Sequence, residues 1–524
     1  MKLYNDLERG GVITTSAAEQ SPSDSRRRSF TWRAGVVAAL LFVSYAYFYE
    51  AGGANQNSRF DAVRAIVEKR TLRIDAYNEN TTDKAFIRGH WYSDKAPGVA
   101  LLAVPIVAAT RPILDAVGVD LLSYKAIEVE TYVVTVITAG LATVIAAMAL
   151  YWVARHVGAS HGGATFAAIV FGLATPAWAY ATLFWGHALA TAALFIAFAL
   201  AVDARRSGSA RRDVWLGAGV GLAAGWAVVT EFPSAPPAAL IAGLAVAHSW
   251  PGGRHRRVLV GLAGGALVSA VTLLAHNWVA FGSPFHFGYS ENLEFVLRRL
   301  NGEKTGFFGH SYPKPHVMWE LLFGRYRGLL PLAPLLVVGP FGIARLARAP
   351  ETRKTAIVAG IIPLYYLLEN SAFRGWYGGH NYGPRYLAAA LPFLCLGLAT
   401  MWTAARRPLQ GAMALLALWG LALALIAVST DPQPATTVRQ PVAQYLWPAF
   451  RDGRLSLNNA AFTSVGLEYF GTKRFAWNVG ERMGLSGHAS LVPLAALWAA
   501  ALAGWVMLTR DERRRGRRVP ARRR

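Results

Sequence analysis

The sequence predicts an all-α membrane protein that crosses the bilayer with about twelve helices. Its 524 residues are 54% hydrophobic and only 16% charged, whereas soluble globular proteins carry about 25% charged residues. Several apolar runs approach or exceed the roughly 20 residues that cross about 30 Å of hydrocarbon, among them 34–49, 128–153, 257–281 and 385–404. So few charges cannot cover the water-facing surface of a chain this long, and a lipid-facing surface follows.

Basic tracts between the apolar runs orient the helices. We expect membrane helices near 34–50, 128–153, 161–181, 186–203, 213–231, 234–249, 257–281, 329–347, 355–370, 385–404, 409–429 and 489–509. With the N-terminal tail inside, every concentrated basic tract falls in the cytoplasm, as the positive-inside rule requires: 155–156, 205–212, 254–257, 345–354, 406–407 and 510–524. This spread of charge also argues against nucleic acid as the partner of a chain with a net charge of +23.

The apolar stretch 97–118 is left out of this count. As a full crossing it would reverse all later loops and place every basic tract outside. It is therefore expected to lie at the interface or to re-enter the membrane. Pro97, Pro105 and Pro112 suit an interrupted segment better than a continuous span.

Four regions follow from this topology. Residues 1–33 form a disordered cytoplasmic tail, 34–429 a transmembrane module with a long outer loop at 51–127, 430–488 an outer segment, and 489–524 the last helix with a basic cytoplasmic tail. A cleavable signal at 34–49 is the less favoured alternative. Spaced glycines such as Gly217 and Gly221 are expected to pack helices together, and the single cysteine, Cys395, allows no intrachain disulfide.

The first outer loop carries the most informative polar run, from Asp83 to Gly98. It contains an acid–base pair, Asp94–Lys95, directly before Pro97 at the mouth of an apolar helix. Lys95 is suited to meet a phosphate as a point charge, and Asp83 and Asp94 are candidate general bases. Interfacial charges satisfied by water and headgroups are the alternative, but the run as a whole favours function.

Other polar groups stand at the outer ends of helices. His187 follows a tight outer turn, and Glu231 ends an otherwise apolar span, where carboxylates are costly and often functional. Arg325, Arg327 and Arg385 lie on the outer side against the orienting trend, which favours an anionic partner. Gly-rich segment 374–386 adds flat or polar side chains, Trp376, Tyr377, His380 and Tyr382. A helix cap, headgroup contacts or an aromatic belt would explain them without function.

The layout resembles the integral-membrane glycosyltransferases of the GT-C superfamily, nearest the family 39 and 83 branches that include protein mannosyltransferases and the aminoarabinose transferase of lipid A. In those branches one membrane helix precedes a long outer loop, in which a short Lys- or His-Pro-Pro-Leu-like motif opens an interfacial apolar helix. The matching run here is 94–98, Asp-Lys-Ala-Pro-Gly. By this match, Lys95 would hold the phosphate of the donor.

The resemblance leaves the catalytic base open. In the family an acid just after the first helix usually takes this role, but the matching stretch here, 55–59, reads Asn-Gln-Asn-Ser-Arg. The candidates that remain are Asp61, Asp75, Asp83, Asp94 and Glu231.

The resemblance implies transfer of a sugar from a polyprenyl phosphate to an envelope glycan, lipid or protein on the outer face of the plasma (inner) membrane. Lys95, Arg325, Arg327 and Arg385 would neutralise the leaving phosphate. Candidate substrate contacts are Asn57, Arg59, His90, Tyr92, His187, Trp376, Tyr377, His380 and Tyr382. No cofactor is predicted, although a divalent metal at His187 or His380 with a carboxylate stays open.

Two other classes compete with the transferase. A transporter or lipid flippase would carry ionisable residues near the membrane midplane, whereas the charges here stand mainly at helix ends. A non-catalytic assembly protein of the envelope would differ only in lacking activity.

Overall fold

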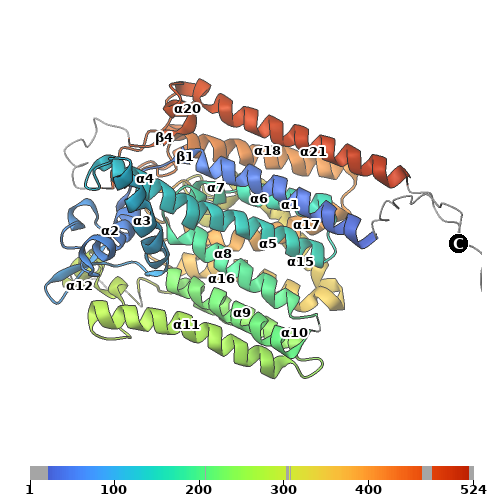
Figure 1. Cartoon of the computed structure of the whole chain (residues 1–524), viewed down its shortest axis with the longest axis horizontal. Helices are drawn as coiled ribbons and strands as arrows, with labels where there is room; N and C mark the ends of the chain where they lie inside the picture. The colour runs from blue at the N-terminus through green and yellow to red at the C-terminus, as the bar shows by residue number, and fades with distance from the viewer. Residues whose placement is uncertain (1–21, 207, 302–305, 307, 463–474, 519–524) are drawn as a thin grey trace, which may run out of the picture.

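A computed structural model describes residues 22–206, 208–301, 306, 308–462 and 475–518. Long helices lie side by side across the molecule in Figure 1, and the shorter elements of the first loop gather at its left end. The long helices are α1 (Pro22–Ala46), α5 (Ala142–His156), α6 (His161–Leu173), α8 (Gly186–Asp203), α9 (Ala210–Thr230), α10 (Ala235–Ser249), α11 (His255–Phe281), α15 (Gly339–Arg348), α16 (Pro350–Ala372), α17 (Leu391–Ala404), α18 (Arg407–Thr430) and α21 (Val492–Arg518).

The remaining helices are α2 (Ala54–Lys69), α3 (Gly98–Ala116), α4 (Tyr124–Thr135), α7 (Ala177–Ala181), α12 (Leu293–Leu300), α13 (Pro315–Phe323), α14 (Leu329–Leu332), α19 (Trp447–Arg451) and α20 (Val479–Arg482). A π-helical turn, Val136–Leu141, joins α4 to α5. Two short antiparallel pairs complete the fold: β1 (Phe48–Tyr49) with β4 (Trp477–Asn478), and β2 (Lys84–Ile87) with β3 (His90–Ser93). The predicted all-α membrane fold is thereby confirmed.

Eight helical stretches of the described residues are long and apolar enough to cross a membrane. They are Gly98–Ala116, Tyr124–His156, Gly186–Asp203, Ala210–Thr230, His255–Phe281, Arg385–Ala404, Arg407–Thr430 and Gly487–Arg510, and two shorter apolar helices are Trp32–Ala46 and His161–Leu173. The count of twelve crossings stays a prediction. The helix α3, which the sequence places at the interface, is itself long and apolar enough to cross a membrane. It lies with α2 and α4 at the left end of Figure 1.

Prolines explain where the observed helices differ from the expected ones. The expected helix 161–181 is divided into α6 and α7, with Pro176 at the start of α7. The expected helix 329–347 is divided into α14, a 3₁₀ segment starting at Pro334, and α15. Proline lacks an N–H donor and clashes with the preceding turn, so it starts or breaks a helix. At the N-terminus α1 already begins at Pro22, so 22–33 is helical, while 1–21 of the expected disordered tail lies outside the described residues.

Small residues let α9 and α11 pack at close range. A Cβ added to Gly217 or Gly221 would overlap the backbone of α11, and a Cβ on Gly261 or Gly265 would overlap the backbone of α9. The glycine spacing expected to pack helices does so here, since only a hydrogen at these positions allows the two backbones to approach. This contact fixes the end of α9, which carries Glu231.

The basic turns meet at one end of the helices. Arg254 Nη1 donates to the carbonyl oxygen of Arg206 at 3.0 Å and pairs with Asp213 at 3.0 Å. Lys354 Nζ donates to the carbonyl oxygen of Ala247 at 3.1 Å. The turns after α8, α10 and α15 are thus neighbours, so these three helices end on the same side. The polar residues at the start of α8 and at the end of α9 lie at the opposite side.

Candidate functional site

A cavity of about 540 Å³ lies where the first loop meets the polar ends of α8, α9 and α16. Its polar wall carries Asn55, Arg59, Asp94, Lys95, His187, Glu231, Ser234, Tyr289, His310, Tyr365, Tyr366, Glu369, Arg385 and Tyr386. Its apolar wall includes Ala190, Val228, Phe232, Leu273, Phe287, Ala388 and Ala389. A site with charged groups at one side and hydrocarbon at the other suits a ligand that is itself amphipathic.

The β2–β3 hairpin brings three charged groups together. Asp83 directly precedes β2 and Asp94 directly follows β3, and Lys84 stands opposite Ser93 in the antiparallel register. As a result Lys95 Nζ lies 2.9 Å from Asp83 Oδ2 and 3.2 Å from Asp94 Oδ2. The amide of Asn292 donates to the same Asp94 oxygen at 2.5 Å.

The two carboxyl groups of this triad differ in their pKa. Burial acts to raise the pKa of Asp83, but the attraction of Lys95, Arg385 and Arg59 outweighs it and holds that pKa below its ordinary value. For Asp94, which is 1% exposed, burial dominates and raises the pKa, with repulsion from Asp83 adding to the effect against the attraction of Lys95. Asp83 is therefore the carboxylate that stays ionised most readily.

A second charged pair joins α2 to the end of α9. Arg59 Nη2 lies 2.8 Å from Glu231 Oε1, and the same guanidinium donates to Asn55 Oδ1 and to the carbonyl oxygen of Ala96. His187 Nδ1 stands 3.7 Å from the same oxygen of Glu231. Burial raises the pKa of Glu231 despite the opposing charge of Arg59. The pair ties the first loop to the membrane helices across 172 residues of sequence.

Arg385 brings a further cation to the cavity. Its guanidinium lies 4.9 Å from the centre of the Trp185 ring and 5.1 Å from that of Tyr386. Nη2 donates to Tyr386 Oη at 3.2 Å, while the buried Nε has no hydrogen-bond partner in the described part of the chain. Among the described residues no carboxylate lies within ion-pair distance of Arg385, so its charge is available to an anionic ligand.

A second cavity of about 530 Å³ adjoins the first. Asn55 and Arg385 line both cavities. Asp83 lies on the wall of the second cavity, and its ion-pair partner Lys95 lies on the wall of the first cavity. The second wall is polar and largely uncharged: Gln56, Asn57, Asn80, Thr81, Thr82, His380, Gln433 and Asn458 contribute to it.

These two cavities bring together half of the residues that the sequence singled out. On their walls lie Asn57, Arg59, Asp83, Asp94, Lys95, His187, Glu231, His380 and Arg385. The chain thus gathers residues from the first loop, from the start of α8, from the end of α9 and from residues 380–385 before α17 around one space.

The other candidates lie off both walls. Asp75 and His90 pair with each other at 2.8 Å on the outside of the hairpin, and Asp61 is buried in α2, where it accepts from Asn80. Arg325 is exposed. Tyr92 packs on Phe281, and Tyr382 is buried. Arg327 donates to the carbonyl oxygens of Tyr326, Tyr377 and Gly379. The rings of Trp376 and Tyr377 both contact the ring of Tyr326.

Several wall residues carried no signal in the sequence. His310 Nε2 lies 2.8 Å from Glu369 Oε1 on the wall of the first cavity. Trp185, which lies beneath Arg385, is on the wall of the second cavity, and Asn292, which donates to Asp94, supports the wall of the first from behind; no sequence pattern indicated either role. The aromatic turn around Trp185 was the one hint, since it precedes His187.

No metal centre is evident in the described part of the chain. It contains no group of three or more His, Cys, Asp or Glu side chains arranged to hold an ion. A divalent metal at His187 or His380 has therefore no full ligand set among these residues.

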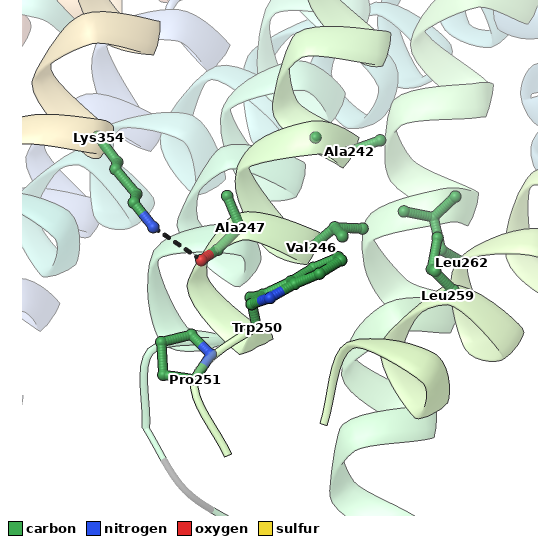
Figure 2. A pocket seen from close by; sticks show the side chains of 9 residues that line it. Ala242, Val246, Ala247, Trp250, Pro251, Leu259, Leu262 and Lys354 are labelled. Carbon is green, nitrogen blue, oxygen red and sulfur yellow. Dashed lines mark hydrogen bonds between the residues drawn. The ribbon is translucent and has the colours of Figure 1, made fainter. Parts of the chain in front are cut away.

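A separate hollow lies between α10 and α11, at the end where the basic turns meet. Figure 2 shows that its wall is apolar, with Val246, Trp250, Leu259 and Leu262 around it. Lys354, the charged residue on its wall, donates to the carbonyl oxygen of Ala247 at 3.1 Å. This hollow offers a contact for hydrocarbon but no group for catalysis.

The chain is a multi-pass, almost wholly helical membrane protein, and its fold is the GT-C-like one that the first outer loop predicted. No protein-family model matches the chain, and no curated protein matches it by sequence. Among solved structures it is similar to ArnT from Cupriavidus metallidurans bound to undecaprenyl phosphate, with 14% identity over 90% of this chain and 76% of that one and a TM-score of 0.50.

Two further structures have lower scores. The apo state of the same ArnT gives 16% identity over 83% of this chain and 71% of that one, with a TM-score of 0.47. The apo oligosaccharyltransferase of Archaeoglobus fulgidus gives 14% identity over 82% of this chain and 60% of that one, with a TM-score of 0.45.

Proposed function

We propose that this protein is a glycosyltransferase that moves a sugar from a polyprenyl phosphate to an acceptor on the outer face of the plasma membrane. The observation that carries the proposal is the amphipathic cavity in which Lys95 and Arg385 face an apolar wall. The bound undecaprenyl phosphate of the ArnT structure supports the same class of donor for a chain with this fold.

The donor would bind with its phosphate at the cations and its isoprenoid chain along the apolar wall. Lys95 contributes a point charge, and Arg385 presents a guanidinium that has no carboxylate within ion-pair distance among the described residues. Val228 and Leu273 line the side on which hydrocarbon would lie. Fixed cations next to the leaving phosphate stabilise the charge that develops as the bond to the sugar breaks.

Asp83 is the base that we propose for the reaction. It faces the second cavity, is held against Lys95 at 2.9 Å, and has a lowered pKa that keeps it ionised at neutral pH. The acceptor hydroxyl gives its proton to Asp83 while its oxygen forms a bond to the anomeric carbon. The bond from that carbon to the phosphate oxygen breaks in the same step, polyprenyl phosphate leaves, and the anomeric centre inverts.

The other acids then have supporting roles. Asp94 is buried, accepts from Asn292 and holds Lys95 in place. Glu231 fixes Arg59 at the boundary between α2 and α9. Neither role requires the carboxylate to exchange a proton with substrate.

The distribution of basic turns supports an outer site. Those turns meet at the ends of the helices opposite to both cavities, and basic turns stay in the cytoplasm. A cysteine introduced at exposed Thr82, on the rim of the second cavity, should react with a membrane-impermeant maleimide added to whole cells, since the native Cys395 is buried. Labelling only after lysis would place the site on the cytoplasmic face.

Transfer itself is tested with purified protein in proteoliposomes. Undecaprenyl phosphates that carry radiolabelled hexoses and pentoses are the donors, and an envelope extract supplies acceptors. Lys95→Ala should abolish transfer while the protein remains folded, and Lys84→Ala, a lysine off both walls, should retain it. Movement of the lipid between leaflets without any transfer would identify a flippase instead.

A further inference from the structure

The second cavity differs in chemistry from the first. Its wall is built from backbone of 52–54 and 460–461 and from amide and hydroxyl side chains, whereas the first has a broad apolar side. The side chains concerned are those of Asn55, Gln56, Asn57, Asn80, Thr81, Thr82, Gln433 and Asn458. Such a wall suits a ligand that is polar over its whole surface.

Three polar atoms in the residues of this wall are buried without a hydrogen-bond partner among the described residues: Gln56 Oε1, Asn80 Oδ1 and Trp185 Nε1. The amide orientations are fixed by the bonds of their nitrogens. Gln56 Nε2 donates to Gln433 Oε1 at 2.8 Å, and Asn80 Nδ2 donates to the carbonyl oxygen of Phe462 at 2.9 Å. Two acceptors and one donor are thus left for a ligand, and a hydroxyl group can both donate and accept.

The charges on this wall offer no excess of cations to an anionic ligand. Glu79 and Asp83 supply two carboxylates, and Arg385, which also faces the first cavity, supplies one cation. Lys95, on the wall of the first cavity, pairs with Asp83 at 2.9 Å. Burial, with repulsion from Arg327 and Arg385, lowers the pKa of His380, so the imidazole is neutral at pH 7. A phosphate here would meet no net positive charge.

We infer that the second cavity is the acceptor site and that the acceptor is an uncharged, hydroxyl-rich sugar, such as the end of a neutral glycan. This inference rests on the proposed function. The attacking hydroxyl would reach the donor at the boundary marked by Asn55 and Arg385, where Asp83 takes its proton and the oxygen displaces polyprenyl phosphate from the anomeric carbon. The acceptor and the lipid donor would thus enter through different cavities.

Two variants test the acceptor site without disturbing the donor site. Trp185→Phe removes an N–H that has no partner among the described residues and keeps the ring beneath Arg385. Thr82→Trp fills the exposed rim of the second cavity. Trp402→Phe is the matched control, because Trp402 stacks on Phe166 away from both cavities.

The experiment measures two ligands separately in detergent-solubilised protein. Saturation-transfer NMR titrations give Kd for neutral octyl hexosides and pentosides and for the same glycosides carrying a phosphate, and thermal unfolding reports binding of undecaprenyl phosphate. We expect neutral glycosides to bind more tightly than phosphorylated ones. Loss of one hydrogen bond in Trp185→Phe should raise Kd about five- to tenfold, and Thr82→Trp should abolish binding.

Undecaprenyl phosphate should stabilise all of these variants as it does the wild type. The inference is overturned if neutral glycosides fail to bind the wild type, if phosphorylated ones bind better, or if Thr82→Trp leaves their binding unchanged. It is also overturned if Trp185→Phe weakens undecaprenyl phosphate binding instead. Absence of stabilisation by undecaprenyl phosphate in the wild type would count against the proposed function rather than against a sugar site.

Discussion

Replacing Lys95 by methionine removes the ammonium that lies between Asp83 and Asp94 at 2.9 and 3.2 Å. In the proposed complex the same ammonium binds the donor phosphate. A hydrogen bond to a charged group contributes about 1.5–3 kcal/mol, and 1.4 kcal/mol is tenfold in affinity. The affinity for undecaprenyl phosphate should therefore fall about 10- to 100-fold.

The substitution also leaves a buried carboxyl group without its partner. Breaking a buried ion pair by removing one member costs about 3–5 kcal/mol when the other stays charged. Asp94 avoids part of this cost by binding a proton, because its pKa is already raised by burial and rises further without Lys95. For an acid with a raised pKa, the stability that protonation gives is present at low pH and is lost as pH rises. Lys95→Met should thus be most stable under acidic conditions.

The assay follows thermal unfolding against undecaprenyl phosphate concentration at pH 7.5, from which Kd is obtained by linkage. The double variant Lys95→Met with Asp94→Asn removes the unpaired acid and separates binding from stability. Lys84→Met is the matched control, because Lys84 Nζ bonds Asn78 and lies over Trp91, off both cavity walls. If the folded double variant binds undecaprenyl phosphate as tightly as the wild type, Lys95 does not hold the phosphate.

Three further predictions concern the base, the pair across α2 and α9, and helix packing. Asp83→Asn should lower kcat by roughly 10²–10⁴-fold, as for loss of a general base. The wild-type rate should stay level on acidification until the pH nears 3.8, since the pKa of Asp83 is lowered below that value. A fall in rate near pH 6 would assign the base elsewhere. Arg59→Met should destabilise the fold by about 3–5 kcal/mol, and thermal unfolding should show that adding Glu231→Gln restores much of the lost stability. Equal stability of the single and double variants would show that the pair has no energetic role. Gly265→Ala places a Cβ against the backbone of α9 and should cost about 1–3 kcal/mol, whereas Gly264→Ala, with open space around it, should cost nothing; equal melting temperatures would refute the close approach of the helices.

The membrane helices were predictable because each depends on a local property, the length of an apolar run. The run 186–203 and the helix α8 coincide, and 257–281 lies within α11. Interruptions depend on single residues, and the expected helix 161–181 was wrong in its continuity, since α7 begins anew after Pro176.

The site was predictable where its members are close in sequence. Asp83, Asp94 and Lys95 lie in one loop, and a hairpin between them is enough to make the contact. The same loop shows the limit of such reasoning: Asp75 and His90 have equally suitable chemistry, but the hairpin turns them outward. Which face of a hairpin meets the helices depends on the packing of the whole chain.

Contacts between distant helix ends could not be derived from patterns. Glu231 was a candidate because of its position at a helix end, but its partner Arg59 lies 172 residues away. The amide-lined cavity combines 52–57, 79–83, 433 and 458–461, and no spacing links these segments. Their meeting depends on the order in which the membrane helices pack.

A structure determined by electron cryomicroscopy with undecaprenyl phosphate present tests the donor site most directly. We predict that the phosphate lies about 3 Å from Lys95 Nζ, within hydrogen-bond distance, close to Arg385, with the isoprenoid chain beside Val228 and Leu273. A phosphate bound away from Lys95, for instance beside Lys354 at the opposite end of the helices, would contradict the proposed reaction centre.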